Sequence, residues 1–269
     1  MARRRLGFWA QLVFTLAVAA FLLVPVGLSI VAGVTRTYLI GIESGLTLKW
    51  VWQVLDMYSD TIWLSLGIAG ACLVVTLAIG VPLAYVLART RGWMGRIVEE
   101  LIVLPIAIPG LAIALALIVT YGGVGSFRQN WSFILTGHVL FTLPFMVRPV
   151  LAVMASGQLR ELEDSAASLG ASFRQRFLNV VLPNARSGIL AGSLMVITLS
   201  IGEFNLTWML HTPAMKTLPI GLADSYASMR LEVASAYTLI FFMLIVPLLA
   251  AIQIWADLTR VARTRPAPR

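Results

Sequence analysis

The chain has 269 residues, of which 59% are hydrophobic and 12% are charged, and its formal net charge is +8. Soluble domains carry about 25% charged residues, so this composition excludes an ordinary water-covered domain. The mean hydropathy is +0.89, and the apolar residues form continuous blocks of the length that crosses a bilayer, about 20 residues. The composition therefore indicates an all-α integral membrane protein, and the continuous blocks exclude the alternating segments of a transmembrane β-barrel.

Six apolar segments are predicted to be transmembrane helices of a single domain, 1–269. In chain order they are 8–34, 62–86, 98–120, 133–153, 189–210 and 236–254. The first follows Met-Ala-Arg-Arg-Arg, but its apolar run exceeds the roughly 7–15 residues of a signal peptide, so we expect a retained helix. Pro105 and Pro109 are expected to kink the third span, because proline lacks the amide hydrogen that a helix needs.

The basic residues lie mainly on one side of the predicted bundle. If the N-terminus is cytoplasmic, fourteen of the 20 Lys and Arg lie at cytoplasmic ends of spans, five lie outside, and Arg148 lies within the fourth span. Lys and Arg are concentrated in the cytoplasmic loops of membrane proteins. We therefore expect both termini in the cytoplasm, and the positive charge needs no nucleic-acid partner.

The sequence lacks the motifs of ATP hydrolysis and of intramembrane catalysis. Neither of its two lysines, Lys49 and Lys216, belongs to a Gly-x-x-x-x-Gly-Lys-Ser/Thr loop. Its two histidines form no His-Glu-x-x-His motif, and the single Cys72 excludes an internal disulfide. We expect no catalytic residue, metal site or cofactor in this chain, so a partner chain would bind any ATP and Mg²⁺.

The segment 155–188, between the fourth and fifth predicted spans, is the most polar stretch of the chain. Apolar residues at helical spacing predict a short amphipathic helix, Gly170 predicts its end, and a second apolar series predicts another helix. The first series is Leu159, Leu162, Ala166 and Leu169; the second is Phe173, Phe177, Val180 and Val181. The pair must bury its apolar face, either under the bundle or in a groove of a partner.

This segment also contains a spaced signature, which consists of Asp164-Ser165-Ala166, Gly170, Val180 and Leu182-Pro183. It resembles the EAA loop of type I ABC importer permeases, with Asp for Glu, Ser for Ala and Val for Ile. Weaker resemblances to the same family are LPIAIPGLAIALALI in the third span, Pro82-Leu83-Ala84-Tyr85, the segment 138–149, and Ser200-Ile201-Gly202-Glu203-Phe204.

The resemblance implies a MetI-like permease fold and a chain that forms the translocation path for a small solute across the bacterial cytoplasmic (inner) membrane. The implied partners are an ABC ATPase dimer, a second permease subunit, with a heterodimer favoured over a homodimer, and a periplasmic or extracellular solute-binding protein. The motifs favour the spermidine and putrescine, 2-aminoethylphosphonate and iron(III) branch, whereas the Gly-Glu-Phe element also occurs in molybdate and sulfate permeases. The alternatives are a membrane scaffold and a self-contained secondary transporter, which would normally show paired inverted repeats.

In this family the EAA loop is implied to form coupling helices that sit in a cleft of the ATPase. The residues implied here are Leu162, Asp164, Ser165, Ala166, Gly170, Phe173, Phe177, Leu182 and Pro183. Apolar side chains would anchor the loop, Gly170 would allow a tight turn, and Asp164 would set the docking register.

Charged groups inside a span are expensive and mark candidate functional sites, here Arg148 and Glu203, which the titratable His138 joins. At 1.5 Å per residue, His138 and Glu203 lie at a similar depth, about 10 Å from the outer surface, and Arg148 lies about 25 Å down. We expect His138 and Glu203 to meet, with Ser200 and Asn205 on neighbouring turns. Glu203, with nothing in its sequence neighbourhood to neutralise it, either makes a structural hydrogen bond or lines the path. Arg148 either snorkels to the headgroups or bonds a helix end.

The outer loop 211–234 is expected to contain a short helix over 221–229 that rests on the bundle. Its apolar residues, which a freely solvated loop would lack, are Leu218, Ile220, Leu222 and Met229. Its cations Lys216 and Arg230 are expected to face the binding protein.

Overall fold

The computed structural model describes residues 2–90 and 92–264, and the elements in that part of the chain are helices, with two isolated β-bridges in loops. The chain forms two compact units. One unit comprises the chain up to Ser59 together with Gly221–Leu244, and the other comprises Asp60–Ile220 and the chain from Ile245. The helical architecture that the composition predicts is confirmed.

Four helices are long and apolar enough to cross a membrane unbroken. They are the apolar part of α1 (Ala2–Ala32), α3 (Ser59–Arg89), α6 (Trp131–Met154) and α13 (Leu231–Thr264). Two bent helix pairs are further candidates: α4 (Trp93–Ala107) meets α5 (Gly110–Tyr121) at 104°, and Phe173–Asn184 meets α10 (Arg186–Ile201) at 67°. The described chain therefore has four candidate spans, or six if each bent pair is one span.

The third and fifth predicted spans are not continuous helices, which corrects the expected ranges 98–120 and 189–210. Ile108, between α4 and α5, is extended, with φ −91° and ψ 130°, and Pro109 follows it. Proline disfavours the helical region for the preceding residue, so the chain turns there instead of forming a shallow kink. In the other segment α10 ends at Ile201, and a short helix α11 (Asn205–Leu210) begins after Gly202–Phe204.

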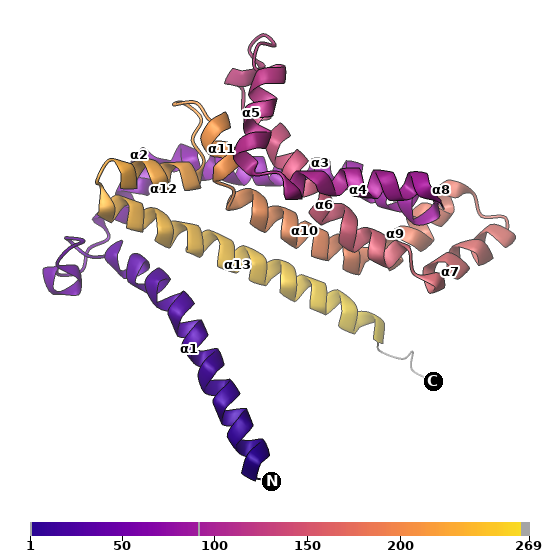
Figure 1. Cartoon of the computed structure of the whole chain (residues 1–269), viewed down its shortest axis with the longest axis horizontal. Helices are drawn as coiled ribbons and strands as arrows, with labels where there is room; N and C mark the ends of the chain where they lie inside the picture. Colours follow the sequence, from indigo (N-terminus) through magenta and orange to yellow (C-terminus); the bar gives the residue numbers. More distant parts are fainter. Residues whose placement is uncertain (1, 91, 265–269) are drawn as a thin grey trace. The chain divides into compact units, whose positions relative to one another are not determined.

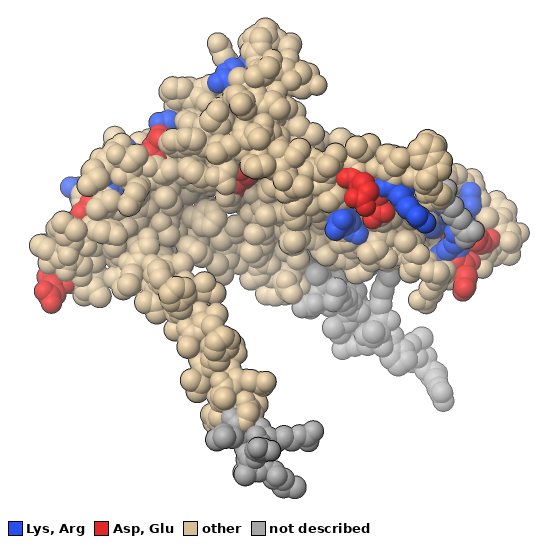
Figure 2. Space-filling model, in the orientation of Figure 1, with Lys and Arg blue, Asp and Glu red and all other residues tan. Residues whose placement is uncertain are grey.

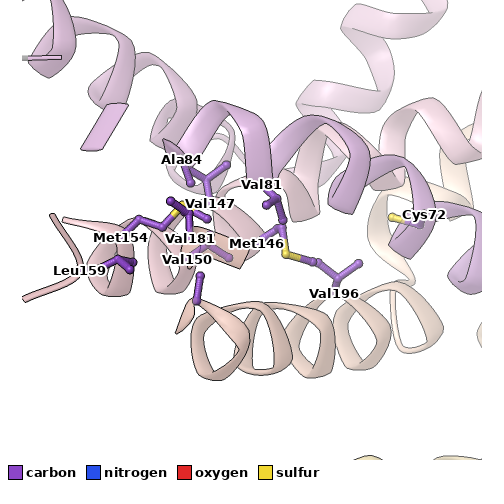
Figure 3. Packing of buried hydrophobic residues seen from close by; sticks show 11 residues of the cluster. Cys72, Val81, Ala84, Met146, Val147, Val150, Met154, Leu159, Val181 and Val196 are labelled. Atoms are coloured by element: carbon purple, nitrogen blue, oxygen red, sulfur yellow. The ribbon is translucent and has the colours of Figure 1, made fainter. Parts of the chain in front are cut away.

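The larger unit is built around α6, which packs along α10 and lies beside α3 (Figures 1 and 3). Met146 on α6 is fully buried between Val81 of α3 and Val196 of α10. Glycines allow this close approach, because a Cβ at Gly80 or at Gly192 would lie 2.8 Å from a Met146 side-chain atom. Small residues at helix contacts are typical of membrane bundles, where dispersion contacts drive association.

The smaller unit contains α1, the short helices η1 (Gly41–Ser44) and α2 (Lys49–Met57), most of α12 (Leu218–Ala227) and the start of α13. The end of α1 meets α13 at a glycine, since a Cβ on Gly33 would lie 2.7 Å from the Ser235 carbonyl carbon. The Glu232 carboxylate accepts a hydrogen bond from the Tyr38 amide at 2.8 Å. These contacts hold the loop after α1 against the start of α13.

The short outer helix exists, but it begins at Leu218 instead of residue 221. Leu218 and Ile220 are buried, as expected, whereas Met229 is 79% exposed, so its expected packing is wrong. Met229 lies beyond the end of α12 at Ala227, so it does not share the packed face of that helix, and it adopts a positive φ of 57°. Arg230 donates a hydrogen bond to the Tyr58 hydroxyl at 2.7 Å.

Candidate functional site

A helix pair lies at one end of the larger unit, where α7 (Gly157–Ser168) is followed by α8 (Phe173–Arg176) (Figure 1). The amides of Gly170 and Ala171 close the end of α7 by donating to the carbonyls of Ala167 and Ala166. Gly170 has φ +82°, a conformation that side chains disfavour, although a Cβ there would meet nothing within 4 Å. Ser172 and Gln175 then form a capping box that starts α8. The predicted order of helix, glycine turn and helix is confirmed.

The second helix continues through a π-helical segment, η3 (Phe177–Val181), and α9 (Leu182–Asn184) before it turns into α10. The helix pair is thus joined directly to a bent membrane-length segment. Leu182 and Pro183 line an open apolar groove of about 550 Å³ together with Leu77 of α3 and Ile189 of α10.

The apolar residues of the pair do not share one environment, which corrects the expected single face. Leu159 is buried among the core side chains of α6, whereas Leu162 is 46% and Leu169 is 89% exposed. Phe173 is 57% exposed, and its ring lies 5.8 Å from Tyr85 of α3 and stacks on Phe177. The inner residues therefore pack on the bundle, as one of the two expected modes of burial requires, whereas the outer residues are uncovered in this chain.

The polar residues of the EAA signature lie on the open side of α7. Asp164 and Ser165 are exposed, and Ala166 is half-buried. The Ser165 hydroxyl donates to the Glu161 carbonyl at 2.8 Å. Charged side chains gather around the α7 and α8 end, while most of the visible helix surface of this unit carries none (Figure 2). This end therefore gathers many of the charged side chains of the unit.

Glu163, which sequence reasoning did not select, is the buried acidic residue of the helix pair, with 3% of its surface exposed. Its carboxylate accepts a hydrogen bond of 2.5 Å from the Tyr85 hydroxyl and one of 2.9 Å from Arg89 Nε, and a second Arg89 nitrogen also donates to it. Arg176 Nη1 lies 3.9 Å away. Burial alone would raise the pKa of Glu163, but the hydrogen bonds from Tyr85 and Arg89 and the charges of Arg89 and Arg176 hold this pKa below its ordinary value. A signal existed, since Glu163 lies four residues after Leu159, on the same face.

A second polar group lies between α6, α10 and α11, around the buried His138. His138 Nδ1 lies 2.8 Å from Ser200 Oγ, and Nε2 lies 2.8 Å from Thr207 Oγ1 and 3.9 Å from Glu203 Oε2. Because the Thr207 hydroxyl donates its single hydrogen to Glu203, at 2.7 Å, it must accept from His138 Nε2–H. The Ser200 hydroxyl then donates to Nδ1 when the imidazole is neutral. His138 and Glu203 meet across the helices, as their depths predict.

The Glu203 carboxylate is stabilised by hydrogen-bond donors from its own sequence neighbours, which the expectation of an unsupported charge had not included. Its two carboxylate oxygens accept from the amides of Leu206 and Thr207, each at 2.8 Å, as well as from the Thr207 hydroxyl. These donors are the otherwise unsatisfied N–H groups at the start of α11, where a negative charge is favourable. Asn205 is exposed beside this cluster, and Arg148 is exposed ten residues further along α6 than His138.

Four membrane-length helices and two bent, membrane-length helix pairs in the described chain indicate a multi-pass membrane protein. A family model described as "Binding-protein-dependent transport system inner membrane component" matches residues 80–260. The match covers well over half of the chain, and the chain belongs to this family of inner membrane permease components.

Three relatives with named transport systems are similar to part of this chain. A probable molybdenum ABC transporter permease protein from Haloferax volcanii is 36% identical over 175 residues, which are 62% of this chain and 64% of the relative. The molybdenum transport system permease protein ModB of Azotobacter vinelandii is 28% identical, over 55% of this chain and 70% of the relative. The spermidine/putrescine transport system permease protein PotB of Haemophilus influenzae is 29% identical, over 55% and 57%. The chain thus matches between 57% and 70% of the length of these relatives.

Proposed function

We propose that this chain is the permease subunit of an ATP-driven importer and that its α7 and α8 helices dock in a separate ATPase, which binds the ATP and Mg²⁺. The observation that carries the proposal is the pair of exposed side chains Leu169 and Phe173, which flank the turn at Gly170. Large apolar side chains left uncovered in an otherwise polar loop mark an interaction surface. Leu162 and Asp164 would border the docked face, while Phe177, Leu182 and Pro183 would support it from the bundle side.

The translocation path is proposed to run beside the break between α10 and α11. This break lies next to the break before α5, because a Cβ on Gly110 would lie 3.6 Å from the Asn205 Cβ. Helices broken at adjacent positions are typical of transporter binding regions. Along this path we place Asn205 and the group of His138, Ser200 and Glu203, with Arg148 nearer the other end of α6.

The remaining partners follow from the same proposal. A second, different permease subunit would complete the path, and a solute-binding protein would deliver the solute near Lys216 and Arg230. The distribution of basic residues supports cytoplasmic termini, which places α7 and α8 on the cytoplasmic side with the ATPase. In a self-contained secondary transporter, the exposed helix pair would have no ATPase to contact.

For the solute we propose a tetrahedral oxyanion of the molybdate class. Relatives named as molybdenum permeases support it, as does the Gly202-Glu203-Phe204 element. The second candidate is a polyamine or an aminophosphonate; the resemblance to a spermidine/putrescine permease supports the polyamine.

The test uses the complex of this chain with its ATPase, second permease and binding protein, reconstituted in proteoliposomes. The ATP hydrolysis rate and solute accumulation are measured with molybdate, sulfate or spermidine. We expect molybdate to stimulate hydrolysis and to accumulate inside. Stimulation by spermidine alone would overturn the oxyanion assignment, and a chain that never copurifies with an ATPase would overturn the importer.

A further inference from the structure

The buried carboxylate of Glu163 joins the helix pair to a membrane helix that is distant in sequence. Arg89, its main partner, lies 74 residues earlier and is the last residue of α3. Tyr85, one turn before Arg89, contributes the 2.5 Å hydrogen bond from its hydroxyl. The end of α3 is thus held to α7 by donors on two successive turns.

The same arginine also reaches a third helix. Arg89 Nη1 donates to the carbonyl of Met154, the last residue of α6, at 3.0 Å. The Arg89 guanidinium lies 5.3 Å from the centre of the Tyr85 ring, which itself contacts Phe177 at 5.2 Å. Arg176 approaches the carboxylate from α8. Glu163 is therefore the centre of a cluster in which α3, α6, α7 and α8 converge.

This cluster is stiff because the Glu163 carboxylate at its centre is buried and hydrogen-bonded, while Arg89 and Arg176 are partly buried, with 21% and 26% of their side chains exposed. Removing one partner of a buried, hydrogen-bonded ion pair leaves an unpaired charge, which is far more costly than losing a surface contact. Side-chain networks of this kind have few alternative arrangements. A displacement of α7 must therefore either carry α3 with it or break several charge-assisted hydrogen bonds.

The cluster lies close to the proposed contact with the ATPase, where a rigid connection can transmit movement. The exposed residues Leu169 and Phe173 lie within ten residues of Glu163 and are the proposed ATPase contact. The chain connects this loop directly to α6 and α10, but not to α3. A movement of the loop must therefore reach α3 through side-chain contacts, and the direct polar contacts between α7 and α3 in the described chain are those of Glu163 with Tyr85 and Arg89.

We propose that Glu163 is a positioning residue that transmits the movement of the docked helix pair to α3 through Arg89 and Tyr85. This inference rests on the proposed function, because it needs an ATPase that moves α7. It assigns Glu163 a role separate from that of its neighbour Asp164, which is exposed and available to the ATPase. Glu163 and Asp164 are adjacent on α7 but differ in burial, so transmission is assigned to the buried residue, while the exposed one borders the docked face.

The experiment compares Glu163→Gln with the matched control Glu161→Gln in the complete reconstituted complex. Glu161 lies on the same helix but is exposed. We expect both variants to copurify with the ATPase, because the exposed anchors are untouched. In Glu163→Gln, solute accumulated per ATP hydrolysed should fall about tenfold, within the usual range of coupling between sites. Glu161→Gln should keep the wild-type ratio.

Arg89→Gln should reproduce the loss, and the double variant Glu163→Gln/Arg89→Gln should add nothing to it.

A distance measurement detects transmission without any transported solute. Spin labels are placed at Gln158→Cys on α7 and Val86→Cys on α3, both exposed, while the native Cys72 is fully buried and stays unlabelled. In the wild-type background the distance between the labels should be the same without nucleotide and with ATP and vanadate. In Glu163→Gln it should shift between these states, because α7 moves without α3.

The outcomes separate the two proposals. An unchanged label distance together with normal uptake in Glu163→Gln would overturn transmission through Glu163 and leave docking intact. A lower melting temperature with an unchanged ratio of solute to ATP would reduce Glu163 to a structural role and would also overturn it. Loss of the ATPase from the wild-type complex would instead overturn the proposed function.

Discussion

At the residue scale, two acidic side chains are stabilised by different donors. Glu203 is held by the amides at the start of α11, and Glu163 is held by side chains from other helices. The first arrangement is local and the second is tertiary. Loss of a donor at Glu203 should therefore affect one helix break, whereas loss of a donor at Glu163 should affect several helices.

The Thr207 hydroxyl, which joins His138 to Glu203, should matter for stability. Thr207→Ala removes a donor to Glu203 and leaves His138 Nε2–H without its acceptor, which should cost about 1–3 kcal/mol. The matched control is Thr198→Ala on α10, where the hydroxyl donates to a carbonyl of its own helix. Thermal unfolding of the detergent-solubilised protein measures both, and a Thr207→Ala variant as stable as the control would contradict the assignment.

The stability of the Glu163 cluster should depend on pH in a defined direction. The pKa of Glu163 in the folded state is lowered, so its ion pair contributes fully above the unfolded-state pKa of about 4.3. This contribution is lost as the pH falls through the folded-state pKa. Melting temperatures measured between neutral and acid pH should therefore fall less steeply for Glu163→Gln than for the wild type. Identical slopes in the two proteins would contradict the arrangement.

At the element scale, the spans follow from the sequence and the breaks do not. Apolar runs indicate which segments cross the membrane, but a run is equally apolar whether its helix is straight or bent. Pro109 marks one break, although its sequence alone did not distinguish a kink from a 104° turn. The sequence does not reveal the break at Gly202–Phe204. Glu203 accepts hydrogen bonds from amides in the first turn of α11, the helix that directly follows it, and this contact is visible only in the structure. Glu163 was overlooked because a charge on an amphipathic surface helix is usually solvated, and its partner lies 74 residues away.

Position 170, in the turn between α7 and α8, should require glycine because of its backbone conformation and not because of crowding. A side chain at φ +82° costs roughly 1–2 kcal/mol, whereas the surroundings offer free space. Gly170→Ala should therefore weaken copurification with the ATPase, and Gly170→Trp should abolish it and stop transport, while membrane insertion stays normal. Gly157→Ala, in the first turn of α7 and equally open, is the control. Normal uptake and normal copurification of Gly170→Trp would contradict a docking role for this turn.

At the scale of the whole molecule, the described chain combines membrane-length helices with an exposed helix pair, α7 and α8. The family, the four unbroken spans and the order of helix, glycine turn and helix could all be predicted from the sequence. The split of the apolar loop residues into buried Leu159 and exposed Leu169 could not. Periodicity assigns residues to a face of a helix, but only the packed bundle determines how much of that face it covers.

Crosslinking from Leu169 tests the central claim most directly. Because Cys72 is fully buried, Leu169→Cys provides a unique accessible thiol for a photoreactive crosslinker in the assembled complex. The matched control is Val124→Cys, an exposed position in the loop between α5 and η2 (Phe127–Gln129). The account predicts a crosslink to the ATPase from position 169 and none from position 124. No crosslink from position 169, or equal crosslinking from both positions, would contradict it.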